Sequence, residues 1–528
     1  MKMNWKLKAV VSVAALTVFL TGCMNSGGMG GMDHSKMNMG GNKEESTSEN
    51  TKTSELSATV LTGKSLTLKA QVSNQEIAPG VTLPVWTFNN SVPGPELRIK
   101  QGEMVNINLV NELPDPVSIH WHGVPLPNDM DGIPGVTQNA VQPGESFVYK
   151  FKADVPGTYW YHSHQDSANQ LDRGLYGSFI VEDSENEKVD RDYSLILDEW
   201  NSKGTMDMDE VNMSDNSMEG MDHSQMNMSE ESNTMDMKHD MSMYDLFTIN
   251  GKSSSLVSNL NVKEGEKVRI RLTNAGFISH QIHLHGHEFR ITATDGQPVN
   301  KPGIVKESVI AIAPGERYDI EFEANNPGQW YIEDHGDNAA VKGMKALITY
   351  EGISENSDKA NDLEALPVVD MTQYGENGQR TFSLEQKYTL DYTMNLNTEL
   401  KNNKTVYTIN GATFPETEAI KVKKGDTVKV KMINNSKSDD HPMHLHGHFF
   451  QVLSKNGKAI TGAPLMKDTL NLKPGEEYVV AFKADNEGNW MFHCHDLHHA
   501  ASGMVTQLLY TDYKTDFVPD PKAGNKPE

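Results

Sequence analysis

The feature that most constrains the fold is an internal repeat, which occurs three times along the 528 residues. Each copy contains a Lys-x-Gly turn followed by Glu or Asp, then an apolar strand and a His-x-His-Gly motif, and later a Pro-Gly-Glu turn. The His-x-His-Gly motifs are residues 120–123, 283–286 and 444–447. Because a pattern of this length does not recur by chance, we predict three homologous domains.

Between these motifs, apolar and polar residues alternate in short runs that end in Gly, Pro or Asn, as in residues 105–110 and 428–432. Alternation with a period of two is typical of strands with one buried face, and the frequent turns favour mostly antiparallel strands packed as sandwiches. We therefore predict an all-β fold. The predicted segments are domain one at 56–184, domain two at 185–355, a linker at 356–384, domain three at 385–516 and a tail at 517–528.

The beginning of the chain predicts export from the cytoplasm. Three lysines precede an apolar run from 9 to 20, which is too short to span a bilayer. The run ends in Leu20-Thr21-Gly22-Cys23, which resembles the lipobox of bacterial lipoproteins. The resemblance implies a signal peptide over 1–23 and an extracytoplasmic protein, anchored to the outer face of the bacterial membrane by a lipid on Cys23. The alternative is an ordinary secretory signal with an incidental cysteine.

The composition narrows the possible functions. Acidic residues exceed Lys plus Arg by 72 to 47, so the chain is predicted to repel nucleic acids. Only 2 cysteines accompany 20 histidines and 28 methionines, which excludes a disulfide scaffold and any four-cysteine metal site. Many methionines lie in a predicted flexible tether at 24–55 and in an insert at 201–243. Because clustered thioethers bind Cu(I), we interpret both segments as copper-binding.

Four His-x-His pairs are the candidate metal ligands. On a strand, residues i and i+2 project to the same face, so each pair can present two imidazoles together. We predict that the pairs converge between domains one and three and hold several metal ions with open positions for a small substrate. The pairs are His120/His122, His162/His164, His444/His446 and His493/His495. Since domains one and three supply all of them, a monomer is sufficient.

The last pair encloses the cysteine Cys494, whose thiolate points to the other face of the strand. His441, His499 and Met504 are available as further ligands in the same domain. Two histidines, a thiolate and a long axial thioether describe a blue-copper electron-transfer site. Zinc fits less well, because structural zinc prefers four strong ligands and does not need a methionine.

Residues 120–123, 162–164, 441–447 and 493–504 resemble the four signature motifs of multicopper oxidases, the family of laccases, ascorbate oxidase and bacterial copper-resistance oxidases. The resemblance covers the whole folded region and implies three consecutive cupredoxin-like Greek-key β-sandwich domains. It also implies four copper ions. A substrate loses electrons singly at type 1 copper, and Cys494 passes them to a trinuclear cluster where four electrons reduce O₂ to water.

The resemblance further implies which residues bind which ion. The implied ligands are His441, Cys494, His499 and Met504 for type 1 copper, His120 and His444 for type 2 copper, and His122, His162, His164, His446, His493 and His495 for the type 3 pair. Asp131 matches an acidic catalytic residue near type 2 copper, and a surface turn is the alternative. The chain departs from several bacterial members at Ala500, where they carry a glutamate implicated in proton delivery; Asp496 and His498 are the remaining candidates.

Domain two lacks the thiolate, because Asp334 aligns with Cys494. We therefore predict no blue copper there. His280, His283, His285, His335 and Met344 nevertheless remain at their repeat positions. We interpret them as a structural remnant, and an auxiliary copper site is the alternative.

The substrate is the most open question. The methionine-rich insert, and Asp439 and Asp440 beside the type 1 ligand His441, favour oxidation of Cu(I) in copper tolerance. Those carboxylates are candidates for binding a cation, although they also fit a solvated turn. The first alternative is a laccase-like oxidase of phenols or aromatic amines. A non-enzymatic copper store explains the methionines but not the His493-Cys494-His495 bridge. A copper nitrite reductase shares the fold, but four His-x-His pairs favour an oxygen site.

Overall fold

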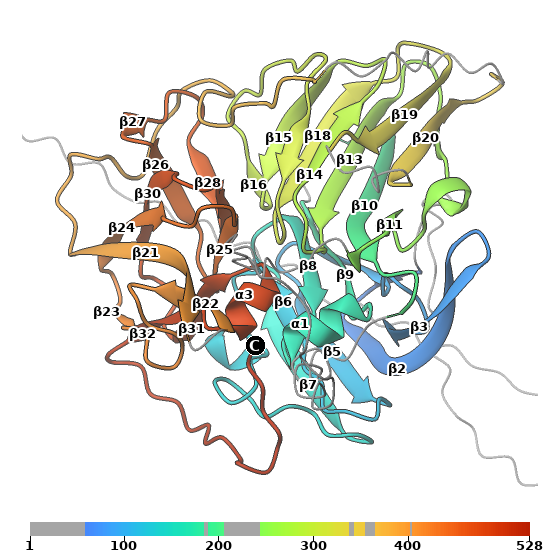
Figure 1. Ribbon diagram of the computed structural model, residues 1–528. Coiled ribbons are helices and arrows are strands. Elements are labelled where there is room, and N and C mark those ends of the chain that lie inside the picture. Colours follow the sequence, from blue (N-terminus) through green and yellow to red (C-terminus); the bar gives the residue numbers. More distant parts are fainter. Residues whose placement is uncertain (1–58, 184–187, 205–242, 337–342, 354–364, 402–403) are drawn as a thin grey trace, which may run out of the picture. The chain divides into compact units, whose positions relative to one another are not determined.

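The computed structural model describes residues 59–183, 188–204, 243–336, 343–353, 365–401 and 404–528 (Figure 1). Strands dominate, and the α-helices of the described part are the short α1 (Ser167–Asp172) and α3 (Leu497–Ala501). This confirms the all-β prediction. None of the helices in the described part is long and apolar enough to span a bilayer. Cys23, the tether 24–55 and most of the insert 201–243 lie outside the described residues.

Domain one consists of a five-stranded and a four-stranded sheet, with strand orders β1-β4-β9-β8-β6 and β3-β2-β5-β7. Its strands are β1 (Val60–Thr62), β2 (Ser65–Ala78), β3 (Val81–Phe88), β4 (Glu96–Lys100), β5 (Met104–Asn111), β6 (His120–His122), β7 (Ser146–Lys152), β8 (Gly157–His162) and β9 (Tyr176–Glu182). The predicted strand 105–110 lies within β5, where Val105, Ile107 and Leu109 are fully buried. Alternation in the sequence therefore reports one face turned to the core.

Domain two has the strand orders β11-β10-β13-β18-β15-β16 and β12-β20-β19-β14-β17. Its strands are β10 (Arg191–Trp200), β11 (Leu246–Ile249), β12 (Leu260–Val262), β13 (Lys267–Asn274), β14 (His280–Leu284), β15 (Phe289–Thr294), β16 (Gln297–Pro298), β17 (Ile310–Ile312), β18 (Arg317–Glu323), β19 (Gln329–Asp334) and β20 (Lys345–Tyr350). The sequence between β10 and β11 contains the predicted insert.

Domain three repeats this plan with the orders β22-β21-β24-β30-β26-β27, where β28 also pairs with β26, and β23-β32-β31-β25-β29. Its strands are β21 (Leu390–Lys401), β22 (Lys404–Ile409), β23 (Ile420–Val422), β24 (Thr427–Asn434), β25 (His441–Leu445), β26 (Phe450–Lys455), β27 (Lys458–Ala459), β28 (Leu465–Lys467), β29 (Thr469–Leu472), β30 (Glu477–Lys483), β31 (Asn489–Cys494) and β32 (Val505–Tyr510). The predicted strand 428–432 lies within β24.

Most strand pairs are antiparallel, as predicted, but each domain also contains parallel pairs. The pairs β2·β5, β10·β13 and β21·β24 are parallel and occupy equivalent places in the three domains. A parallel pair cannot be joined by a tight hairpin and needs a longer crossover connection. Alternation in the sequence reports which face of a strand is buried, but it carries no information on strand direction.

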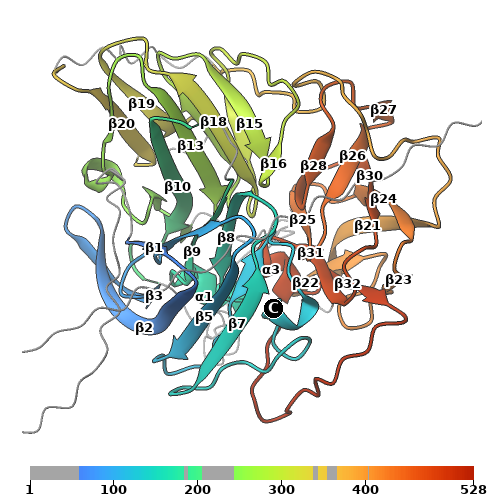
Figure 2. The same cartoon turned by 180° about the vertical axis from the view of Figure 1, so that it is seen from behind.

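The apolar core explains where the site forms. One continuous cluster of buried side chains contains residues of both domain one and domain three, among them Trp121 and Cys494. The core of domain two is a separate cluster around Ile270 and Ile320. In Figures 1 and 2, the strands of domain one are coloured blue to teal, those of domain two green to yellow, and those of domain three orange to red. The edge strand β6 meets β25 and the residue after it where domains one and three pack together, since histidine rings from the two sides stack.

Candidate metal centres

Four strands bring the His-x-His pairs together. In domain one β6 pairs with β8 so that His120 lies opposite His162, and in domain three β25 pairs with β31 so that His444 lies opposite His493. The second histidine of three pairs lies just past the end of its strand. All eight side chains are buried, with at most 1% of each residue exposed: His120, His122, His162, His164, His444, His446, His493 and His495.

The eight imidazoles form one continuous cluster across the domain boundary. Ligand atoms lie within 4.8 Å of one another in each of three sets, which are His120/His122/His444, His122/His162/His495 and His164/His446/His493. Across the boundary, the ring of His120 stacks on that of His446 with a centroid distance of 3.9 Å, and the rings of His122 and His444 stack at 3.7 Å. Each set combines histidines of both domains, so neither domain alone completes the site.

The hydrogen bonding and the pKa values of these rings suit copper binding. Nε2 of His120, His162, His164 and His444 and both ring nitrogens of His495 are buried without a hydrogen-bond partner. Burial, together with the neighbouring imidazoles, holds the pKa of His122, His162, His446, His493 and His495 well below the ordinary value of histidine. Neutral rings with unused lone pairs are the form that binds a metal, and imidazole suits copper.

Asp131 fixes two of these rings from the side away from the cluster. The residue is buried, and it follows the short 3₁₀-helix η1 (Asn128–Met130). Its backbone oxygen lies 2.9 Å from Nδ1 of His120, and its Oδ2 lies 3.0 Å from Nδ1 of His446. The next residue, Gly132, has a φ of 82°, and a Cβ there would collide with the carbonyl oxygen of Ile119. Asp131 therefore orients histidine rings from two domains.

Asp468 has the corresponding position in domain three, and sequence reasoning missed it. Its backbone oxygen lies 3.0 Å from Nδ1 of His444, and its Oδ1 lies 3.3 Å from Nε2 of His122. The neighbouring Thr469 hydroxyl lies 3.0 Å from the same two nitrogens. Because Asp468 belongs to no sequence motif, only the register of β25 against β29 reveals its position.

Domain two contributes a buried cation to this arrangement. Nη1 and Nη2 of Arg317 donate to the two oxygens of Asp468 at 2.7 and 2.6 Å. Both side chains are almost completely buried, with exposures of 0 and 1%. Although burial opposes it, the guanidinium holds the pKa of Asp468 well below its ordinary range, so the carboxylate stays ionised beside the histidines.

Residues 524–528 pack against one side of the histidine cluster. The backbone oxygen of Pro527 lies 2.5 Å from Nδ1 of His164, and Oε1 of Glu528 lies 3.3 Å from Nδ1 of His493. Hydrogen bonds between Gln165 and the chain at Gly524 and Lys526 hold this segment against domain one. Burial raises the pKa of the Glu528 carboxyl well above its ordinary value. No signal in the sequence of this segment indicates such a position.

A second candidate centre lies around Cys494, which is fully buried. The Nδ1 atoms of His441 and His499 lie 3.3 Å apart, and Cys494 Sγ lies 3.8 and 3.6 Å from them. Met504 is also fully buried, and its backbone oxygen accepts a hydrogen bond from the Cys494 amide. The candidate ligand atoms of His441, Cys494 and His499 thus converge. Met504 is tied to the same place by its backbone hydrogen bond with Cys494.

Polar and aromatic neighbours orient the two histidines of this centre. Nε2 of His441 lies 2.7 Å from the Ser436 hydroxyl, and Nε2 of His499 lies 3.3 Å from Oδ2 of Asp496. The ring of Tyr407 stacks on His499 with a centroid distance of 3.8 Å. In both histidines Nδ1 therefore faces Cys494, as a metal ligand requires.

The other candidates lie near the Cys494 centre. Asp439 Oδ2 accepts a hydrogen bond from Thr398, and Asp440 Oδ2 accepts one from Asn471. Burial raises the pKa of Asp440, which also lines a cavity of about 350 Å³ between domains two and three. Asp496 caps helix α3 and faces His499. Ala500 and His498 are buried, and the His498 ring lies 4.6 Å from that of Phe277.

In domain two, the position of the thiolate is part of a buried ionic cluster. Nδ1 of His280 lies 2.9 Å from Oδ2 of Asp334, and its Nε2 lies 3.2 Å from Oε2 of Glu199. Although burial opposes it, the two carboxylates raise the pKa of His280 to about 10. Because both ring nitrogens already have partners, His280 has no lone pair left for a metal.

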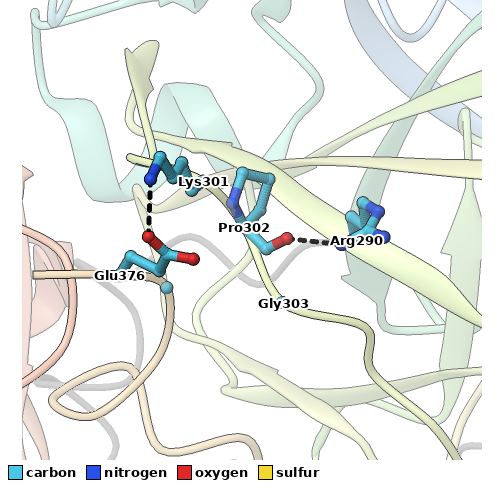
Figure 3. A pocket seen from close by; sticks show the side chains of 6 residues that line it. Arg290, Lys301, Pro302, Gly303 and Glu376 are labelled. Carbon is cyan, nitrogen blue, oxygen red and sulfur yellow. Dashed lines mark hydrogen bonds and ion pairs between the residues drawn. The ribbon is translucent and has the colours of Figure 1, made fainter.

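A shallow surface pocket of about 550 Å³ lies between domain two and the segment that follows it. It is lined by Arg290, Lys301, Pro302, Gly303, Gly375 and Glu376. Lys301 forms an exposed ion pair with Glu376 at 2.7 Å, and Arg290 donates to the Pro302 carbonyl (Figure 3). The charged groups satisfy one another, and the pocket contains none of the candidate ligands.

Comparisons with known proteins place the chain in a family. Two models described as multicopper oxidase match residues 69–186 and residues 207–351 and 380–514. The chain is 30% identical over 445 residues to multicopper oxidase MmcO of Mycobacterium tuberculosis, covering 82% of this chain and 84% of that one. It is 25% identical over 545 residues to copper resistance protein A of Escherichia coli, and the match covers 80% of this chain and 88% of that one. A multi-copper oxidase structure from Pseudomonas thermotolerans superposes with a TM-score of 0.62 at 28% identity, covering 86% of this chain and 100% of that one. The chain therefore belongs to the multicopper oxidase family of copper-dependent oxidoreductases.

Proposed function

We propose that this multicopper oxidase oxidises Cu(I) to Cu(II) in copper tolerance. The balanced reaction converts four Cu(I), one O₂ and four protons into four Cu(II) and two molecules of water. Four bound copper ions would supply the one-electron steps. The ligands around Cys494 and the eight clustered histidines would hold these ions. The chain itself must attract the cation, orient the ligands and hold protons.

The observation that carries the proposal is a hydrogen-bonded chain from a ligand to a carboxylate. Nε2 of His441 lies 2.7 Å from the Ser436 hydroxyl, which lies 3.0 Å from Oγ1 of Thr398, and Thr398 donates to Oδ2 of Asp439 at 2.6 Å. Asp439 is half-buried, so it is accessible to a small cation. A carboxylate here lowers the energy of a cation that lies near His441. That histidine belongs to the centre that would receive the electron of the cation.

The ligand framework is rigid because carboxylates outside the cluster orient it. Asp131 accepts from Nδ1 of His446, and the ionised Asp468 faces Nε2 of His122, which leaves the opposite nitrogen of each ring for the metal. Cys494 is the last residue of β31, and its peptide links connect it directly to His493 and His495. This short covalent route supports electron transfer between the two centres.

The names of the relatives support copper or another metal as the donor without deciding it. Copper resistance protein A of Escherichia coli and the iron transport multicopper oxidase fetC of Epichloe festucae both match most of the chain, at 25 and 29% identity. The methionine-rich insert 201–243 is a further argument, since thioethers bind Cu(I).

The competing function is a laccase-like oxidation of phenols or aromatic amines. Laccase-1 of Botryotinia fuckeliana is 28% identical over 474 residues. Steady-state rates with Cu(I), Fe(II), Mn(II) and a phenol, measured on one preparation, rank these donors. The Cu(I) proposal fails if the phenol has the highest kcat/KM.

The decisive variants are Asp439→Asn and a deletion of 206–243. Both are expected to raise the KM for Cu(I) much more than the KM for a phenol, because only the cation needs the carboxylate and the thioethers. Asp512→Asn is the matched control, since this carboxylate is also in domain three and 65% exposed. Equal changes in KM for both donors would contradict the proposal.

We also propose that the enzyme acts outside the cytoplasm, anchored by a lipid on Cys23, and that a monomer is active. Labelling with a radioactive fatty acid should mark the wild-type chain and not Cys23→Ser. Label retained by the variant would exclude this anchor.

A further inference from the structure

Domain two retains the strand geometry that builds the histidine cluster elsewhere. In domain three, β25 pairs with β31 so that His444 lies opposite His493. In domain two, β14 pairs with β19 in the same way, and His283 lies opposite Glu333. The amide of His285 donates to Tyr331 as that of His446 donates to Met491. His283, His285, Glu333 and His335 are therefore the counterparts of His444, His446, His493 and His495.

Ligand atoms of His285, Glu333 and His335 converge, and the His283 ring lies beside them. Nε2 of His285 lies 3.1 Å from Nε2 of His335 and 3.1 Å from Oε1 of Glu333. Nε2 of His335 lies 3.5 Å from the same oxygen. The His283 ring centroid is 4.6 Å from that of His285 and 5.0 Å from that of His335. Three imidazoles and one carboxylate are a common ligand set for a divalent transition metal.

A second observation is the hydrogen bond at Nδ1 of His283. Its Nδ1 lies 3.0 Å from the backbone oxygen of Ser308, as Nδ1 of His444 lies 3.0 Å from that of Asp468. The registers of β17 and β29 make Ser308 the counterpart of Asp468. This bond fixes the ring so that Nε2 is available as a ligand, which is how metal-binding histidines are oriented.

The chemistry and access of the cluster also suit a metal. Although burial opposes it, hydrogen bonds from His285 and His335 lower the pKa of Glu333 to about 2. Burial and the same two rings lower the pKa of His283 to about 4. The side chains of His285 and Glu333 are 14 and 22% exposed, so an ion can reach them from solvent.

We propose that His283, His285, Glu333 and His335 form a metal site in domain two that binds a divalent transition-metal ion such as Zn²⁺ or Cu²⁺. The site is independent of the substrate assigned above, because the oxidase ligands lie in domains one and three. It favours, for His283, His285 and His335, the auxiliary metal site that the sequence left as the alternative, whereas His280 keeps a structural role. The bound ion links β14 to β19 and stabilises domain two.

The test measures Zn²⁺ binding by equilibrium dialysis to the full-length protein loaded with only the four copper ions of the oxidase centres, so that the site in domain two is free of copper. The wild type should bind one more Zn²⁺ per chain than H285Q/H335Q, or should bind that ion at least about 100-fold more tightly, because even partners outside the coordination sphere contribute about 10- to 100-fold. Glu333→Gln, which changes no side-chain volume, should weaken binding in the same direction and serves if the double variant does not fold. Glu288→Gln, an exposed carboxylate of domain two, is the matched control.

Thermal unfolding gives a second readout. Zn²⁺ should raise the unfolding temperature of the wild type and of Glu288→Gln, and it should not raise that of Glu333→Gln or H285Q/H335Q. The blue absorption of the Cys494 centre should be the same in all of them. Zn²⁺ stoichiometry, affinity and thermal shift that are unchanged in a folded Glu333→Gln or H285Q/H335Q protein would overturn the proposal.

Discussion

Replacing Arg317 tests whether domain two supports the histidine cluster. The substitution Arg317→Met keeps an unbranched apolar stem but removes the guanidinium that binds both oxygens of Asp468. Asp468 then remains beside His122 and His444 as a carboxylate with 1% exposure and without its main cation. It must either stay ionised at a high cost or take up a proton, and both change the hydrogen bonds to the histidines.

The expected magnitude follows from the burial of the pair. Removing one partner of a fully buried ion pair costs about 3–5 kcal/mol, because the other charge is left uncompensated. At about 2–4 °C per kcal/mol for a cooperative unit of 150–250 residues, the unfolding temperature should fall by roughly 6–20 °C. Removing the second charge as well, in R317M/D468N, should recover part of this loss.

The assay is differential scanning calorimetry of the copper-loaded proteins, with copper content and O₂ consumption measured on the same samples. Lys301→Ala is the control, since Lys301 lies on the surface of the same domain and solvent screens its ion pair with Glu376 (Figure 3). An unfolding temperature of Arg317→Met equal to that of Lys301→Ala would refute the reasoning. So would a double variant that is less stable than Arg317→Met, since the cost would then not arise from the unpaired Asp468.

Three further outcomes are expected. The imidazolium of His280 between two buried carboxylates has a pKa of about 10, against about 6.5 when unfolded, so its contribution is complete below pH about 6.5 and is lost as the pH rises to about 10. Urea unfolding should show stability falling by about 1.4 kcal/mol per pH unit in that window, and His280→Gln should remove this slope. Asp131→Asn should lower O₂ turnover by about 10- to 100-fold with the blue absorption retained, because it loosens ligands of the histidine cluster only; an unchanged turnover would contradict its assigned role. Ser436→Ala removes the acceptor beside Nε2 of His441, which weakens that ligand and should raise the reduction potential in a redox titration, whereas a lower potential would count against the assigned hydrogen bond.

The histidine pairs could be predicted because they depend on a local rule. Residues i and i+2 share a face on any strand, so His120 and His122 must project together wherever β6 lies. The repeat then indicated that domains one and three carry equivalent pairs. The same reasoning located Asp334 at the position of the thiolate, from its alignment with Cys494.

Apart from Asp131, the groups that orient the histidine cluster could not be predicted, because they come from distant parts of the chain. Arg317 and Asp468 are 151 residues apart, and neither belongs to a motif. Glu528 and Pro527 reach the cluster only because the chain after β32 returns to domain one. Glu199, at the end of β10, bonds to His280 across 81 residues. Local patterns in a sequence do not encode such contacts.

The central claim is that donor oxidation at the Cys494 centre is coupled to reduction of O₂ at the histidine cluster. It is tested most directly by measuring Cu(I) consumed, O₂ consumed and peroxide formed by the copper-loaded enzyme, with chelated Cu(I) and with Cys494→Ser as the baseline for uncatalysed oxidation. The account predicts four Cu(I) per O₂, no peroxide, and no catalysed reaction with Cys494→Ser. Two Cu(I) per O₂ with release of peroxide, or equal rates for the variant and the wild type, would contradict it.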